Sequence, residues 1–270
     1  MTRRRWIAET WTEASATLVG AQAEHLARVL RAQPGAVADV VAGGRVFRAE
    51  VASVSLAGDA SAAELSEVRF NLIAELEAEP ALPVTLALAI YKFDRMEWAI
   101  EKATELGVAA IAPMVARRTE KHLAEAAAKR TERWRRIAKE AAQQARRSDV
   151  PQVYDPVPLA ERVRAQSTST PASASEATRP EVARIVLAEQ ERTTTLRYAL
   201  DEVLAKAELA GSGARMPALE LAFGPEGGWA PSEEALFDAN GWRAVSLGPR
   251  ILRAETAALA ALAVVASYLE

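Results

Sequence analysis

The pattern of apolar and polar positions divides the chain into two parts of different character. In the N-terminal part, short runs of β-prone residues dominate. From residue 84 onward, apolar runs of strand length alternate with longer segments of helical periodicity. Pro80 and Pro83 interrupt the chain between the two patterns. The pattern therefore predicts a small domain over residues 1–75 and a larger one over residues 76–270.

The small domain is predicted to be a β-barrel. Two β-prone runs flank Gly43-Gly44, a glycine pair that is typical of a two-residue hairpin turn. Before them, residues 24–35 (EHLARVLRAQPG) have the pattern of a short helix that ends at Pro34-Gly35.

The alternating pattern of the large domain predicts an α/β fold. Strands that alternate with helices form a mostly parallel sheet covered on both faces. The expected strands cover residues 84–91, 108–116, 183–189, 218–223 and 242–247. The expected helices cover residues 95–107, 123–147 and 195–209, a segment with Ser232 as its N-cap, and the Ala-rich C-terminus. Residues 166–180 are mostly Ser, Thr, Ala and Pro, so we expect a mobile loop there.

Composition narrows the classes of site and location. The chain has no cysteine, which excludes disulfides and thiolate zinc sites. Its two histidines, His25 and His122, are far apart, which argues against a multi-histidine metal site. No stretch is apolar enough to span a membrane, and no apolar segment follows the basic N-terminus. We therefore expect a cytoplasmic protein without a metal or a membrane partner.

Charge is unevenly distributed along the chain. The net charge is −3, yet residues 117–147 hold 11 Lys and Arg against 4 Asp and Glu, an excess of 11 − 4 = +7. A solvated helix face with internal ion pairs is one interpretation of this excess. A surface for a polyanion such as RNA is the other, and the size of the excess favours it.

Three expected strands end at segments that suit a ligand, near Glu189, Gly224 and Gly248. Ligands of parallel sheets bind beyond the carboxyl ends of the strands. In the segment GPEGG, residues 224–228, the glycines either supply positive φ angles or let a ligand approach the backbone. The same segment also fits a tight turn without a ligand. It lacks the G-x-G-x-x-G spacing, and no Walker lysine is present, which disfavours nucleotide cofactors of those classes.

Two loops together resemble a known family. GPEGG, followed by LGPRILRAETA at residues 247–257, is similar to the paired loops of the SPOUT methyltransferases, and among them of the 16S ribosomal RNA uridine-N3 methyltransferases (the RsmE family). Residues 24–35, 91–122 and 136–151 also resemble segments of that family, so the likeness extends over most of the chain. The departures are Ala145, Arg146, Trp229 and Ala254, where the family commonly has serine, glycine, phenylalanine and threonine.

The resemblance implies S-adenosylmethionine as the cofactor, held in a C-terminal trefoil knot, and a homodimer. It also implies an N-terminal domain similar to the PUA-like RNA-binding barrels. The residues that it assigns to cofactor binding are Leu187, Ala188, Glu189, Phe223, Gly224, Pro225, Gly227, Gly228, Leu247, Gly248, Ile251, Leu252, Arg253, Thr256 and Ala257.

Methylation at uridine N3 requires the loss of the N3 proton, so the site needs a base or a stabiliser of the developing anion. The candidates are Arg253, Glu226 and Glu255, with Arg253 preferred as the stabiliser of the uracil oxygens and a carboxylate as the base. An internal ion pair of Glu255 with Arg250 or Arg253 is an equally open alternative.

The target of N3 methylation must be unpaired or flipped out, because N3 lies on the Watson–Crick edge. The expected partner is 16S ribosomal RNA in the small ribosomal subunit. The residues expected to bind RNA are Arg3, Arg4, Arg5, His25, Arg31, Arg117, Arg118, Arg146 and Arg147. For His25, a hydrogen bond to the backbone at the start of a helix fits equally well.

Two other functions remain open at this point. One is methylation at another RNA position, such as a ribose 2′-hydroxyl, because the fold alone does not choose the acceptor. The other is RNA binding without catalysis, which the intact cofactor loops disfavour.

Overall fold

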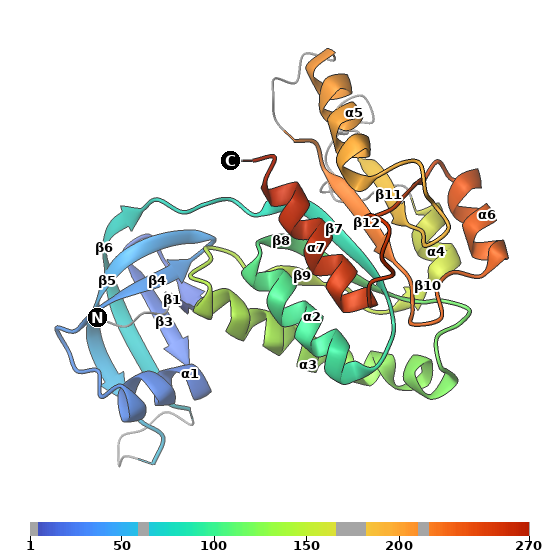
Figure 1. Ribbon diagram of the computed structural model, residues 1–270. Helices are drawn as coiled ribbons and strands as arrows, with labels where there is room; N and C mark the ends of the chain where they lie inside the picture. Colours follow the sequence, from blue (N-terminus) through green and yellow to red (C-terminus); the bar gives the residue numbers. More distant parts are fainter. Residues whose placement is uncertain (1–4, 59–64, 166–181, 210–215, 270) are drawn as a thin grey trace. The chain divides into compact units, whose positions relative to one another are not determined.

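The computed structural model describes residues 5–58, 65–165, 182–209 and 216–269 (Figure 1). Arg3, Arg4 and the loop expected at 166–180 lie outside these residues. The chain divides into two compact units, Met1–Pro80 with Glu140–Val150, and Ala81–Lys139 with Pro151–Glu270. The sequence pattern had assigned residues 140–150 to the second domain, whereas they belong to the first unit.

The first unit contains a six-stranded sheet with the order β1-β4-β5-β6-β3-β2. Its strands are β1 Arg5–Ile7, β2 Thr10–Trp11, β3 Ser15–Val19, β4 Val37–Ala42, β5 Arg45–Ser55 and β6 Glu67–Leu76. All pairs are antiparallel except β1 with β4. The expected hairpin is confirmed: Ala42 lies opposite Arg45, and Gly43 and Gly44 have φ angles of 60° and 79°. The two edge strands, β1 and β2, are consecutive in the chain. Between them, Ala8 N–H donates to the Val41 carbonyl of β4, and Glu9 N–H donates to the Thr17 carbonyl of β3.

The helix expected at 24–35 is shorter than the sequence pattern indicated. It consists of α1 Ala21–Glu24 and a π-helical turn, η1 His25–Val29, so it ends before Pro34. The cause is Arg31, whose φ of 53° is incompatible with a right-handed helix. The segment 140–150 joins this unit through a hydrogen bond from the Gln143 amide to Gln22 and one from Arg5 to the Arg146 carbonyl.

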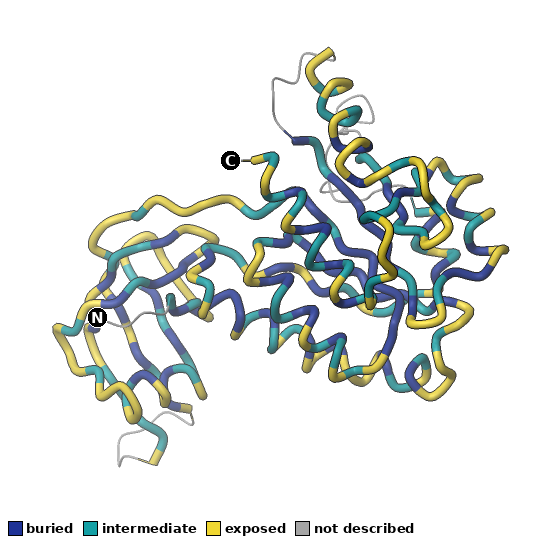
Figure 2. The backbone as a smooth tube through the Cα atoms, viewed as in Figure 1, coloured by how far each residue is buried: buried dark blue, intermediate teal, exposed yellow. Residues whose placement is uncertain are grey.

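The second unit contains a seven-stranded parallel sheet, as the alternating pattern predicted. The order is β10-β8-β7-β12-β11-β13, and β9 also pairs with β8. The strands are β7 Leu82–Ala89, β8 Val108–Val115, β9 Gln152–Val153, β10 Val157–Pro158, β11 Ala183–Leu187, β12 Leu219–Phe223 and β13 Arg243–Val245. Figure 2 shows this sheet largely buried, which explains the continuous apolar runs.

Helices cover both faces of the parallel sheet (Figure 1). One face, with Leu219, Leu221 and Phe223 of β12, packs against helices of one apolar cluster. These helices are α2 Phe93–Glu105, α3 Lys121–Gln144, α5 Leu196–Leu209 and α7 Ala254–Ala266. The other face, with Ala222 of β12, packs against α4 Leu159–Arg164 and α6 Pro231–Ala239.

Helix α6 begins differently from the sequence-based expectation. Ala230, not Ser232, is the N-cap, and Pro231 takes the first helical position. The Glu233 carboxylate accepts the Ala230 N–H at 2.8 Å, which is the contact that a glutamate at the third helical position makes in a capping box. This start fixes the segment between β12 and α6, which contains residues 224–228.

Candidate active site

A cavity of about 440 Å³ opens at the carboxyl-terminal edge of the parallel sheet. The segments that follow β7, β8, β11, β12 and β13 all contribute to its wall. Fourteen of the fifteen residues expected to bind a cofactor line this cavity. They are Leu187, Ala188, Glu189, Phe223, Gly224, Pro225, Gly227, Gly228, Leu247, Gly248, Ile251, Leu252, Arg253 and Ala257.

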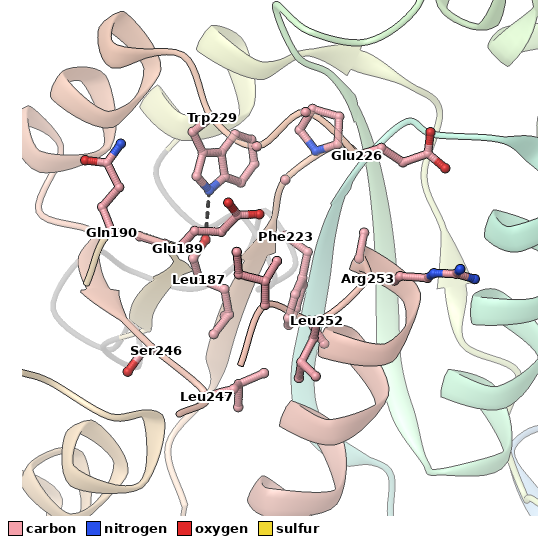
Figure 3. A pocket seen from close by; sticks show the side chains of 18 of the residues that line it. Leu187, Glu189, Gln190, Phe223, Glu226, Trp229, Ser246, Leu247, Leu252 and Arg253 are labelled. Atoms are coloured by element: carbon pink, nitrogen blue, oxygen red, sulfur yellow. Dashed lines mark hydrogen bonds between the residues drawn. The ribbon is translucent and has the colours of Figure 1, made fainter. Parts of the chain in front are cut away.

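Residues 224–228 need their glycines for two physical reasons. A Cβ on Gly224 would lie 3.3 Å from the Trp229 ring, which is tighter than ordinary van der Waals contact. Gly228 has a φ of 68°, and its N–H donates to the Pro225 carbonyl at 2.8 Å. The Trp229 indole N–H donates to the Leu187 carbonyl at 2.9 Å (Figure 3). The tryptophan thus ties the loop after β12 to the end of β11.

The segment after β8 holds the same loop from its other side. Arg118 Nη1 donates to the Gly227 carbonyl at 2.6 Å, and the Arg117 N–H donates to the Glu233 carboxylate at 2.7 Å. Both arginines are exposed and are also among the residues expected to bind RNA. Their contacts here support the shape of the cavity wall.

The cavity has an apolar side and a polar rim. Leu187, Phe223, Leu247 and Leu252 converge on one side (Figure 3). The rim carries polar groups that the sequence interpretation had assigned only in part. They include Glu189, Gln190, Arg192, Glu226, Glu234 and Ser246.

The rim segment after β11 is fixed by a carboxylate. Hydrogen bonds from the Thr193 hydroxyl and from the N–H groups of Thr194 and Thr193 lower the pKa of Glu191 to about 2. Glu191 is therefore ionised at neutral pH, and the segment keeps these hydrogen bonds.

Arg95 interacts with both candidate carboxylates, Glu226 and Glu255. Its Nη1 lies 2.6 Å from Glu226 Oε1, and its Nε lies 3.9 Å from Glu255 Oε1. Glu255 therefore pairs with Arg95, and not with Arg250 or Arg253, the partners that the sequence left open. The Glu255 side chain is 9% exposed, and its Oε2 has no hydrogen-bond partner among the described residues. A buried carboxylate oxygen is thus left able to accept a proton or a hydrogen bond.

Tyr91 lies buried next to this group of charges, and its hydroxyl also has no hydrogen-bond partner in the described part of the chain. Burial raises the pKa of its phenol, and the negative charges of Glu255 and Glu226 raise it further. Tyr91 is therefore a neutral phenol at physiological pH and a possible hydrogen-bond donor.

A second hollow of about 360 Å³, here named the α2–α7 hollow, adjoins the cavity. It is lined by Asp94, Arg95, Trp98, Arg253, Glu255 and Thr256. Arg95 and Arg253 line both spaces. Thr256, the fifteenth residue expected to bind the cofactor, lies here and not in the cavity. Glu255 also lines this hollow, whereas Glu226 lines the cavity.

The remaining residues expected to bind RNA fall on the first unit. His25 and Arg31 are exposed, and the His25 ring lies 6.0 Å from that of Trp6. Arg5 is half-buried and Arg146 is exposed. Arg147 is buried and forms an ion pair with Asp149 at 2.6 Å, so its position favours a structural role.

The basic excess over residues 117–147 is partly neutralised by acids outside that segment. Arg133 makes two hydrogen bonds to Glu97, at 2.7 and 2.8 Å, and Arg135 pairs with Asp155 at 3.1 Å. The excess therefore overstates the positive charge that this segment offers to a polyanion.

Sequence reasoning gave no site role to Lys92 and Arg95, which line the cavity. Both follow β7, which pairs with β12 in the middle of the sheet. The sequence does contain an indication of this role. Both residues follow the first expected strand of the large domain, and that strand ends at the edge of the sheet where ligands bind. Among the described residues, no cluster of His, Cys, Asp and Glu could hold a metal ion, and no helix is long and apolar enough to cross a membrane.

The parallel sheet and the site at its edge belong to a known class. Residues 78–266 match the family described as RNA methyltransferase domain. The chain is 35% identical to the ribosomal RNA small subunit methyltransferase E of Synechocystis sp. over 260 residues, which are 96% of this chain and 75% of the relative. This protein therefore belongs to the ribosomal RNA small subunit methyltransferase E family.

Two solved structures are similar over nearly the whole chain. A putative methyltransferase from Legionella pneumophila with bound cofactor SAM is 28% identical, covers 97% of this chain and 96% of its own, and has a TM-score of 0.74. A ribosomal RNA small subunit methyltransferase E from Neisseria gonorrhoeae, bound to S-adenosylmethionine, is 26% identical, with coverage of 98% and 97% and a TM-score of 0.70.

Proposed function

We propose that this protein methylates N3 of a uridine in 16S ribosomal RNA of the small ribosomal subunit, with S-adenosylmethionine as the methyl donor. The observation that carries the proposal is the cavity at the carboxyl edge of the sheet, where the two loops that resemble the family's cofactor loops meet the segment after β11. The relatives named above are small-subunit ribosomal RNA methyltransferases, and two similar solved structures hold this cofactor.

The residues of the cavity fit S-adenosylmethionine. A volume of about 440 Å³ is in the usual range for small-molecule sites. Leu187, Leu247 and Leu252 offer an apolar surface for adenine, while Gly224, Gly227 and Gly228 add no side chain to the wall. When bound, the cofactor supplies a methyl group already activated on sulfur.

Glu255 supports the role of proton acceptor better than Glu226. Glu226 has a close ion pair with Arg95, at 2.6 Å. Glu255 keeps a buried oxygen without a hydrogen-bond partner among the described residues, so it accepts a proton without breaking a bond. We therefore assign Glu255 as the base that removes the N3 proton, and Glu226 as the residue that positions Arg95.

Arg253 is assigned to the uracil oxygens, which gain negative charge as the N3 proton leaves. It is exposed and forms no ion pair with any described residue, so its guanidinium is free to donate. Figure 3 shows its side chain and that of Glu226 extending to the same side of the cavity, away from the leucines.

We further propose that the first unit is a PUA-like barrel that binds RNA through Arg5, His25, Arg31 and Arg146. The hydrogen bonds of Ala8 and Glu9, which link β4 and β3, support a closed sheet. The trefoil knot, the homodimer and the cytoplasmic location complete the proposal. They rest on the resemblance to the family and on its RNA substrate.

The test is transfer of labelled methyl groups to small ribosomal subunits that lack this modification, followed by nucleoside analysis. The expected product is 3-methyluridine. Arg253→Ala is expected to slow the reaction about 10²–10³-fold. Glu255→Gln is expected to slow it about 10²–10⁴-fold, with cofactor affinity unchanged because Glu255 does not line the cavity.

A different methylated nucleoside would reject the uridine assignment but keep the enzyme class. Binding of RNA without any methyl transfer would favour a non-catalytic role. Full activity of Glu255→Gln would move the base to another group.

A further inference from the structure

The α2–α7 hollow lies outside the cavity assigned to the cofactor, yet it shares two wall residues with it, Arg95 and Arg253. A group bound in the hollow is therefore separated from a group in the cavity by no more than these side chains. Methyl transfer by displacement needs the acceptor and the leaving group on opposite sides of the methyl group. Two adjoining spaces allow this order, with Arg95 and Arg253 beside both reactants.

Trp98 gives the hollow a flat apolar wall. It follows Arg95 by three residues and Asp94 by four, so all three side chains lie on one face of α2. The side chain is 46% exposed although it is large and apolar. Exposed aromatic rings of this kind stack on unpaired bases in single-stranded RNA.

The charges of the hollow favour a neutral ligand. Asp94 and Glu255 carry two negative charges and Arg95 and Arg253 two positive ones, so the sum is 2 − 2 = 0. A phosphate would meet two carboxylates, which disfavours it. A uracil base is neutral and offers two oxygens that accept hydrogen bonds and one N–H that donates. Arg253 suits the oxygens, and the unpartnered Oε2 of Glu255 suits the N–H.

We propose that the α2–α7 hollow binds the flipped-out uracil base of the RNA substrate, with one face of the base stacked on Trp98. This inference rests on the proposed function, because it assumes a uridine as the methyl acceptor. It adds the exposed face of α2 to the residues supplied by the segment 247–257, and it assigns to Trp98 the recognition of the base.

The test compares Trp98→Ala and Trp98→Phe with wild-type protein. Tyr198→Ala is the matched control, since Tyr198 is an exposed aromatic residue on a helix of the same unit and lines neither space. We measure the KM for undermethylated small subunits, the Kd for S-adenosylmethionine by calorimetry, and the mass in solution. Trp98→Ala is expected to raise the KM about 5- to 150-fold. Trp98→Phe and Tyr198→Ala are expected to stay within about threefold of wild type. The Kd and the mass should not change in any variant.

Three results would overturn the inference. The first is a wild-type KM for Trp98→Ala. The second is an equal rise for Tyr198→Ala, which would indicate a general loss of surface contact. The third is a change of mass for Trp98→Ala, which would make the hollow an interface between copies of the chain. Failure of the proposed function would give a different result. Wild-type protein would then yield a nucleoside other than 3-methyluridine, whatever the KM of the Trp98 variants.

Discussion

Gly228 and Gly241 have nearly the same left-handed backbone, with φ angles of 68° and 72°, but only the first lines the cavity. A Cβ at Gly228 would meet nothing closer than 3.8 Å, and one at Gly241 nothing within 4 Å. Alanine at either position therefore causes backbone strain alone, about 1–2 kcal/mol. We expect Gly228→Ala and Gly241→Ala to lower the free energy of unfolding by similar amounts. Only Gly228→Ala should weaken cofactor binding, by roughly tenfold.

Urea unfolding and calorimetry with S-adenosylmethionine measure the two effects separately. Equal cofactor affinity in both variants would show that the loop conformation at Gly228 does not determine binding.

At the scale of residues, the sequence predicted those parts of the site that are contiguous in the chain. Residues 224–228 and 247–257 carry enough glycine and charge to be recognised without a structure. Arg95 was not given a role because its importance depends on two acids, Glu226 and Glu255, that are more than 100 positions away. Only the order of the strands brings these charges together.

At the scale of elements, the central strand β12 carries a buried charge. Glu220 is 2% exposed and pairs with Arg162 of α4 at 2.5 Å and with Arg184 of β11 at 3.8 Å. Its removal leaves two arginines partly buried without this partner. We expect Glu220→Ala to lower the free energy of unfolding by about 3–5 kcal/mol.

The matched control is Glu202→Ala, which breaks the half-exposed ion pair between α5 and Arg243. An exposed pair contributes at most about 1 kcal/mol. Chemical denaturation of both variants measures the difference. Equal losses would mean that burial does not set the strength of the Glu220 pairs.

The long elements of the second unit were predictable, and the short ones were not. β7 and β12 are apolar runs because both faces of the sheet are covered. β9 and β10 have two residues each, which is too few for any period, and so they were missed. β9 pairs with β8 up to Ile111, and β10 pairs with β8 from Met114 onward. Pro113 lies in the unpaired gap between them. A proline lacks the N–H that an unbroken ladder would need.

At the scale of the whole molecule, the proposed homodimer can be measured directly. Helix α7 leaves Ala263 exposed and Ala260 half-buried, and small side chains allow another helix to approach closely. Sedimentation equilibrium is expected to give twice 29.0 kDa at micromolar concentration. A mass of one chain under these conditions would contradict the dimer.

The first unit is completed by residues 140–150, far from the rest of it in the chain. A ribosome that has made residue 80 must add 150 − 80 = 70 more before this segment exists. At 5–20 residues per second, that takes about 4–14 s. During this interval the nascent sheet lacks the segment that bonds to Gln22 and Arg5. The newborn chain therefore exposes an unfinished surface, the kind of surface that chaperones shield during protein synthesis.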